Sequence, residues 1–216
     1  HRPFCRPRRL ALSVLSLALL GALSMPAFAA DPVCLDANGN PISPAPSTDQ
    51  GNEHGTDNAT CDMTDNAYGQ NNNASGKGSS AFGYNNSAWT TNANAFGSVN
   101  QAWGQGSSAF GHLNIAQAAW SSAFGVFNLS TSLQTSAFGF GNNAGGPNHK
   151  RFANAFGGSN MASGEASNAF GSGNSASGDN SAAFGYSNTA SALGSSAFGN
   201  NNIAYDNGSV AMGAYS

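Results

Sequence analysis

Residues 107–116 read SSAFGHLNIA, and residues 121–130 read SSAFGVFNLS. Both stretches place Ala before Phe, Gly after it, and Asn three places beyond that Gly. From Ala67 onward this triplet returns every fourteen residues, with a single interval of eighteen. Its central residues are Tyr68, Phe82, Phe96, Phe110, Phe124, Phe138, Phe156, Phe170, Phe184, Phe198 and Met212. A fixed period of this kind predicts the stacked coils of a repeat architecture.

Further columns keep the same phase. Asn stands four places after each central residue except the last, at 72, 86, 100, 114, 128, 142, 160, 174, 188 and 202. Ala stands six places after it in every one of these copies except one, where Ser130 replaces it. Gly followed by Asn indicates a tight corner, because Gly is free of side-chain clashes and Asn tolerates the left-handed region. Each coil is therefore predicted to contain two short strands joined by turns.

The side-chain alternation of a strand decides which columns lie inside. Neighbouring residues point to opposite faces, so Ala81 and Phe82 cannot share one. A column that accepts only Ala fits the narrow interior of a flattened roll, and Phe then faces outward. Because one Phe and a few Ala bury little apolar surface per coil, the Phe row needs a partner. Identical coils in a homo-oligomer would supply it. We therefore expect an all-β solenoid of 14-residue coils.

The repeat resembles the head repeats of the YadA-like trimeric autotransporter adhesins. The resemblance rests on SSAFG at 79–83, 107–111 and 195–199, with NSASG at 174–178, and covers 64–216. It implies a left-handed parallel β-roll, a homotrimer packed through the Phe row and Met212, and display on a stalk anchored in the outer membrane. The family often has Val two places before its apolar residue, and only Val210 conforms here. We expect no stalk or anchor segment within these 216 residues.

The first residues are typical of an export signal. Four arginines, at 2, 6, 8 and 9, precede an apolar run from Leu10 to Leu23, and the small residues around Ala29 suit cleavage there. The apolar run is too short for a membrane-spanning helix. We expect a signal peptide at 1–29, a polar segment at 30–63, and head repeats at 64–216 with an insertion at 147–150. The product would be secreted across the inner membrane and held at the cell surface.

Removing the signal leaves two cysteines, Cys34 and Cys61. An even pair in an exported, Pro- and Asn-rich segment favours a disulfide. Two free thiols are the alternative, because the sequence does not show that the two residues meet.

Composition argues against several functional classes. Only 8% of residues are charged and the net charge is -3, so nothing suggests nucleic-acid binding or direct membrane contact. His54, His112 and His149 occupy unrelated columns, and most acidic residues lie before Asp65. No catalytic constellation emerges, and we expect neither enzyme activity nor a cofactor or metal.

Two features are candidates for an adhesive surface. Trp89 and Trp103 share a column with Tyr205, opposite in orientation to the interior Ala, and should stack about 4.8 Å apart. Such a ladder suits protein or sugar contact, or merely stabilises the edge of the coils. The insertion brings His149, Lys150 and Arg151 together at a turn. It suits an anionic contact, although a tolerated insertion is the simpler interpretation.

The function expected from the sequence is attachment. A trimeric head would bind host matrix, cells or surfaces through many weak contacts. A structural spacer or self-association module without a specific ligand is the alternative.

Overall fold

The computed structural model describes residues 33–36, 38–43, 48–147 and 150–216. The chain divides into two units after Asp31, and the second unit contains all of the described residues. The predicted signal peptide lies outside them. Among the described residues, no helix is long and apolar enough to span a membrane.

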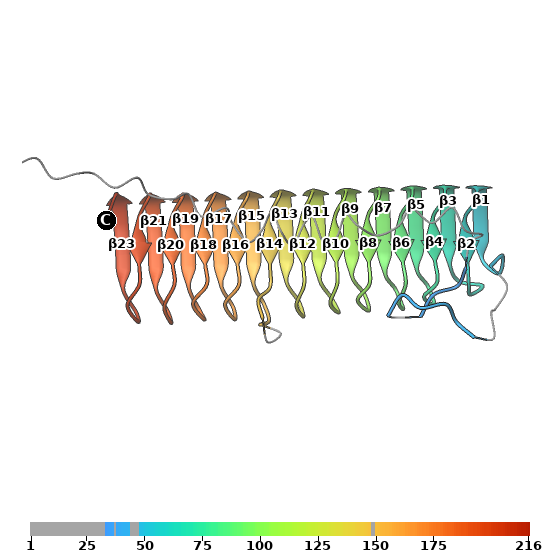
Figure 1. The fold of residues 1–216 in the computed structure, drawn as a ribbon, viewed down its shortest axis with the longest axis horizontal. Helices are drawn as coiled ribbons and strands as arrows, with labels where there is room; N and C mark the ends of the chain where they lie inside the picture. The colour runs from blue at the N-terminus through green and yellow to red at the C-terminus, as the bar shows by residue number, and fades with distance from the viewer. Residues whose placement is uncertain (1–32, 37, 44–47, 148–149) are drawn as a thin grey trace, which may run out of the picture. The chain divides into compact units, whose positions relative to one another are not determined.

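The described residues form two parallel β-sheets (Figure 1). One sheet consists of five-residue strands: β1 Asn52–Thr56, β3 Asn66–Gln70, β5 Ser80–Tyr84, β7 Asn94–Ser98, β9 Ser108–His112, β11 Ser122–Val126, β13 Ser136–Phe140, β15 Asn154–Gly158, β17 Asn168–Ser172, β19 Ala182–Tyr186, β21 Ser196–Asn200 and β23 Val210–Ala214. The other consists of two-residue strands: β2 Ala59–Thr60, β4 Asn73–Ala74, β6 Ser87–Ala88, β8 Gln101–Ala102, β10 Ile115–Ala116, β12 Leu129–Ser130, β14 Asn143–Ala144, β16 Met161–Ala162, β18 Ser175–Ala176, β20 Thr189–Ala190 and β22 Ile203–Ala204.

One long and one short strand make up each coil, and every coil pairs with the next in the same register. Ala123 lies opposite Ala137 and Phe124 opposite Phe138. The predicted all-β solenoid of 14-residue coils is confirmed. Its left-handedness and its trimeric state stay predictions.

The interior between the sheets is filled by small side chains. The alanines before Phe and those in the short strands are fully buried, apart from slight exposure at Ala204 and Ala211 near the last coil. A side chain as large as Leu would push the sheets apart, because the facing columns hold mainly Ala, with Ser130 and Thr60 as larger residues of the short strands. The structure thus confirms that Ala faces inward and that Phe faces the opposite side of the sheet.

The corners differ from expectation. The residue before the repeated Asn, and not the Asn itself, adopts the left-handed conformation, as at Asn85, Val99 and Leu113. A second left-handed position lies in the other turn, at Asn92, Gly106 and Trp120 among others. The repeated Asn is instead buried inside the coil. The expectation that this Asn forms the corner was therefore wrong, because its side-chain amide is buried and makes hydrogen bonds between coils.

The roll also begins one coil earlier than the sequence indicated. β1 and β2 stack on β3 and β4, so the first coil lies within the polar segment expected to precede the head repeats. Glu53 pairs with Ala67 and His54 with Tyr68. The repeat was missed here because polar residues replace the Ala and Phe that define it.

The insertion leaves the stacking intact. It lies in the turn between β14 and β15, and Phe138 still pairs with Phe156 across it. Extra residues are tolerated at this turn because they do not alter the strands on either side.

Candidate functional site

A continuous row of aromatic rings follows the outer face of the long strands. From Tyr68 to Phe198, successive ring centroids are 4.7–5.4 Å apart and the planes are nearly parallel. The Phe rings are half-buried, and Met212 at the last coil is 65% exposed. Neighbouring rings cover each other's faces, but the described residues leave their outer edges partly exposed. The row is therefore a long apolar surface on one side of the roll.

A ladder of buried asparagines fixes the spacing of that row. Asn100 donates its Nδ2 hydrogens to Asn86 Oδ1, to the Phe96 carbonyl and to the Gly111 carbonyl of the next coil, over 2.8–3.0 Å. Its own Oδ1 accepts from the backbone N–H and the Nδ2 of Asn114. The same pattern recurs from coil to coil. Sequence analysis found the column but missed this role, because an Asn after a Gly also fits a corner.

Gly after Phe is required by the same close stacking. At Gly125, with φ +115°, an added Cβ would lie 2.1 Å from the Gly139 carbonyl oxygen. Only Gly allows the coils to approach this closely.

Trp89 and Trp103 form the second aromatic feature. Their rings are stacked with centroids 4.8 Å apart and planes within 5°. Both side chains are half-buried rather than simply exposed. Gly39 of the N-terminal segment lies against Trp89, since a Cβ on Gly39 would come within 2.6 Å of the indole. Tyr205 is 70% exposed and belongs to a distant coil of the same column.

The N-terminal segment is tied to the roll at several points. Cys34 and Cys61 are joined by a disulfide, with Cα atoms 5.7 Å apart. Leu35 N–H donates to Ser75 Oγ, and Asn73 Nδ2 donates to the Val33 carbonyl. Asp36 accepts the backbone N–H groups of Asn38 and Asn40, which closes a turn. These contacts hold Asn38 and Gly39 over the coil that carries Trp89.

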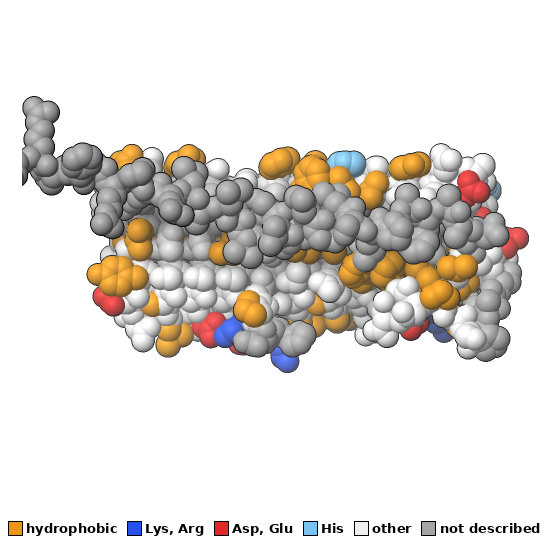
Figure 2. Space-filling model, viewed as in Figure 1, with side chains coloured by type: hydrophobic (Ala, Val, Ile, Leu, Met, Phe, Trp, Pro, Cys, Tyr) orange, Lys and Arg blue, Asp and Glu red, His pale blue; other side chains and the backbone are white. Residues whose placement is uncertain are grey.

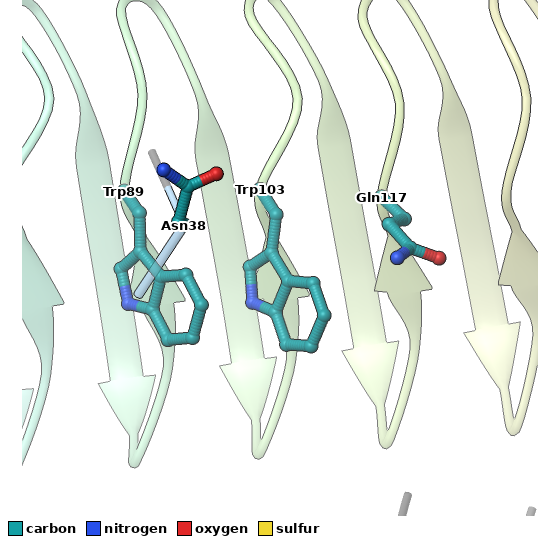
Figure 3. Close-up of a pocket in the computed structure, with 4 residues that line it drawn as sticks. All are labelled: Asn38, Trp89, Trp103 and Gln117. Atoms are coloured by element: carbon teal, nitrogen blue, oxygen red, sulfur yellow. The ribbon is translucent and has the colours of Figure 1, made fainter. Parts of the chain in front are cut away.

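A small cavity opens beside the tryptophans. It has a volume of about 280 Å³ and is lined by Asn38, Trp89, Trp103 and Gln117 (Figure 3). Asn38 lies beside Trp89, while Gln117 follows Trp103 along the same column. The sequence could not predict the place of Asn38, because the disulfide brings it from a separate segment.

One charged residue of the insertion is paired within the chain. Lys150 Nζ lies 2.7 Å from Asp179 Oδ2 in an ion pair. The hydrogen bond from Lys150, with a further one from the Glu165 backbone, lowers the pKa of Asp179. His149 lies outside the described residues, and Arg151 is exposed. Only Arg151 of these three is therefore shown as an exposed charge.

A further apolar surface was missed by sequence analysis. We call Tyr84, Val99, Leu113, Phe127 and Phe140 the edge ridge, because they lie at the ends of consecutive long strands. Tyr84 and Phe140 are the last residues of β5 and β13, and the other three occupy the turn directly after β7, β9 and β11. Phe127 contacts His112 and Phe140 edge to face, with centroids 6.0 Å apart in both pairs. Figure 2 shows several hydrophobic side chains along the upper edge of the roll. Their columns vary between copies, which is the signal that could have revealed them.

Nothing among the described residues resembles a metal centre: no three His, Cys, Asp or Glu side chains there are placed to hold an ion. The candidate binding surfaces described above therefore consist of aromatic rings, side-chain amides and apolar side chains.

Comparison with known families agrees with this geometry. The family model for the YadA head domain repeat, which spans two copies, matches residues 67–86, 74–100, 162–188 and 190–216. No curated protein matches the chain. The matched segments lie near the two ends of a stack whose pairing is unbroken between them. The matched segments of this chain are therefore YadA head domain repeats, which match a YadA-like head domain of a trimeric autotransporter adhesin.

Proposed function

We propose that this chain is the head of a trimeric cell-surface adhesin that attaches its cell to host matrix, to other cells or to surfaces. The observation that carries the proposal is the unbroken row of half-buried Phe rings on one face of the long-strand sheet. An apolar strip of this length on a soluble protein favours a protein partner.

The partner that best fits this Phe row is the same row on two further copies of the chain, in a trimer. The interior of one copy is lined almost entirely by Ala, Asn and Ser, which bury little apolar area. If three copies pack their Phe rows around one axis, identical coils meet in identical layers. Each ring would then lose its exposed edge to a neighbour in the same layer. The match to the family model supports this assembly.

Binding would use the columns that vary while the fold is kept. The Ala, Phe, Gly and Asn columns are committed to interior, interface and ladder. Trp89, Trp103 and the edge ridge lie in variable columns, and each would appear three times around the trimer. Weak contacts repeated in this way give strong attachment through avidity. An export signal at 1–29 and display at the outer membrane would place the head where such contacts occur.

A spacer or self-association module is the second candidate. Ser163, Ser177 and Ser191 occupy the Trp column in later coils, so the outer surface there is polar. The exposed side chains of Tyr84 and Phe140 in the edge ridge weigh against a uniformly inert exterior.

Binding assays on the chain fused to a trimeric coiled coil would separate the two candidates. The fusion would be tested in solution against immobilised collagen, fibronectin and laminin, and against immobilised copies of itself. Adhesion predicts saturable binding to at least one matrix protein. Binding only to itself would support self-association, and binding to neither would contradict the adhesin proposal.

A further inference from the structure

The cavity beside the tryptophans combines aromatic surface with hydrogen-bonding groups. Trp103 stacks on Trp89 through one face, and the next coil places Gln117 instead of a third ring beside its other face. The stack therefore ends in a step (Figure 3). A flat apolar ligand face could rest on Trp103 at this step.

The polar lining suits hydroxyl groups. Asn38 and Gln117 each carry an amide, which both donates and accepts hydrogen bonds. None of the described residues that line the cavity carries a charge. An ionic ligand would therefore lose its hydration without gaining a counter-charge, whereas a neutral ligand with several hydroxyls would find partners of both kinds.

The two indole nitrogens give an independent sign of unused bonding capacity. Trp89 Nε1 and Trp103 Nε1 are both shielded, and neither has a hydrogen-bond acceptor among the described residues. A buried donor without an acceptor is uncommon and costs stability. Two in adjacent coils indicate that the aromatic stack is not optimised for packing alone.

The site is also held in place before any ligand arrives. The disulfide and the hydrogen bonds of Leu35 and Asn73 fix the segment that carries Asn38. Trp89 and Trp103 belong to stacked coils whose spacing the Asn ladder sets. A rigid site avoids the entropic cost of ordering side chains on binding.

We propose that Asn38, Trp89, Trp103 and Gln117 form a binding site for one neutral sugar ring of a glycan. The apolar face of the pyranose lies on the indole of Trp103, and its hydroxyls bond to the two amides. The volume of about 280 Å³ suits one ring rather than an extended chain. The proposal rests on the adhesin function and names the class of ligand for this part of its surface.

Tryptophan fluorescence offers a direct test. The chain has three tryptophans, and Trp120 lies in another column where Asn92 and Asn180 are found. In Trp120→Asn the emission comes from the two cavity residues alone. Oxidised protein would be titrated with the methyl glycosides of glucose, galactose, mannose and N-acetylglucosamine, with methyl sialoside as the anionic comparison. We expect a saturable change with at least one neutral glycoside and none with the sialoside.

Two further variants assign the contact. Trp103→Ser introduces the residue found in the same column at 163, 177 and 191 and leaves the contact between Trp89 and Gly39. It should weaken binding about tenfold or more, measured by saturation-transfer NMR. Gln117→Ser should weaken it less while keeping both rings. The Trp120→Asn variant should bind like the parent chain.

The outcomes that overturn the glycan site are distinct from those that overturn adhesion. The site is wrong if no neutral glycoside binds, if the sialoside binds better, or if Trp103→Ser binds as tightly as the parent. It is also wrong if Trp103→Ser binds normally but melts at lower temperature, since the ring is then structural packing. Retained binding to matrix proteins in any of these cases leaves the adhesin proposal standing.

Discussion

At the scale of single residues, two repeated residues set the spacing of the coils: the buried Asn, through its side-chain amide, and the Gly after Phe, through its lack of a side chain. Asn100, typical of the repeated Asn residues, supplies three donated bonds and two accepted ones inside a coil that has almost no apolar bulk. Each Gly after Phe allows the next coil to approach within contact. The hydrogen-bond ladder thus does in this interior what large aliphatic side chains do in an ordinary core.

Replacing Asn100 by Ala should test the ladder. The change removes one donor from each of the Phe96 and Gly111 carbonyls and leaves the buried backbone N–H of Asn114 without its acceptor, whereas Asn114 Nδ2 keeps its other two acceptors. We expect a loss of about 2–4 kcal/mol in the free energy of unfolding, measured by chemical denaturation. Gln101→Ser, one place along and facing outward, is the control and should cost less than about 0.5 kcal/mol. Equal stability of both variants would show that the amides contribute little.

Backbone strain at the edge ridge leads to a second prediction. Val99 has φ +57°, a conformation that costs an L-residue about 1–2 kcal/mol and is worse for a β-branched one. Asn71, Asn85 and Asn201 occupy the same position in other coils. Val99→Asn should therefore raise stability by about 1 kcal/mol, seen as a higher melting temperature. The reverse change, Asn85→Val, should lower it, and stabilisation by Asn85→Val would contradict the strain argument.

At the scale of elements, the alternation of the long strand was predictable and the partnerships of separate segments were not. Ala123 and Phe124 must point to opposite faces in any strand, so their columns defined interior and exterior directly from the sequence. The buried role of Asn100 was missed, because one residue type serves both corners and ladders. The first coil was missed because Glu53 and His54 stand where the other coils have Ala and an aromatic residue, so the repeat pattern is not visible there. The contact of Gly39 with Trp89 depends on a disulfide between Cys34 and Cys61, which no periodicity encodes.

The two faces of the long strand should respond differently to added volume. Ala123 is fully buried between the sheets, so Ala123→Leu should destabilise the roll by about 3 kcal/mol or more through overpacking. Ser172→Leu adds the same bulk to an exposed column that already holds Tyr84, Phe140 and Tyr186, and should be nearly neutral. Circular dichroism melts of the two variants give the comparison. If Ala123→Leu melts at the same temperature as the parent chain, the claim that the interior has no room for a side chain as large as Leu is wrong.

At the scale of the whole molecule, the balance between interior and surface argues for assembly. One chain buries Ala and polar amides between its sheets and leaves a row of Phe on one face. Ladder hydrogen bonds join the coils along the roll, but they do nothing to remove ring edges from water. The backbone hydrogen bonds along the roll are therefore formed within one chain, whereas the Phe rings become fully buried only when a partner covers the Phe row.

This argument predicts a trimer that is marginal as a monomer. Sedimentation of the chain fused to a trimeric coiled coil should show a β-rich trimer, whose melting temperature rises with concentration once the fusion is cleaved, because dissociation exposes the rings. Phe124→Ala removes one ring from each copy in the same layer and should cost about 3–5 kcal/mol per ring. Phe140→Ala removes an exposed ring of the edge ridge and is the matched control, since it should leave the association constant nearly unchanged. A cleaved chain that stays folded and monomeric at low concentration, with Phe124→Ala as stable as Phe140→Ala, would show that the Phe row needs no partner.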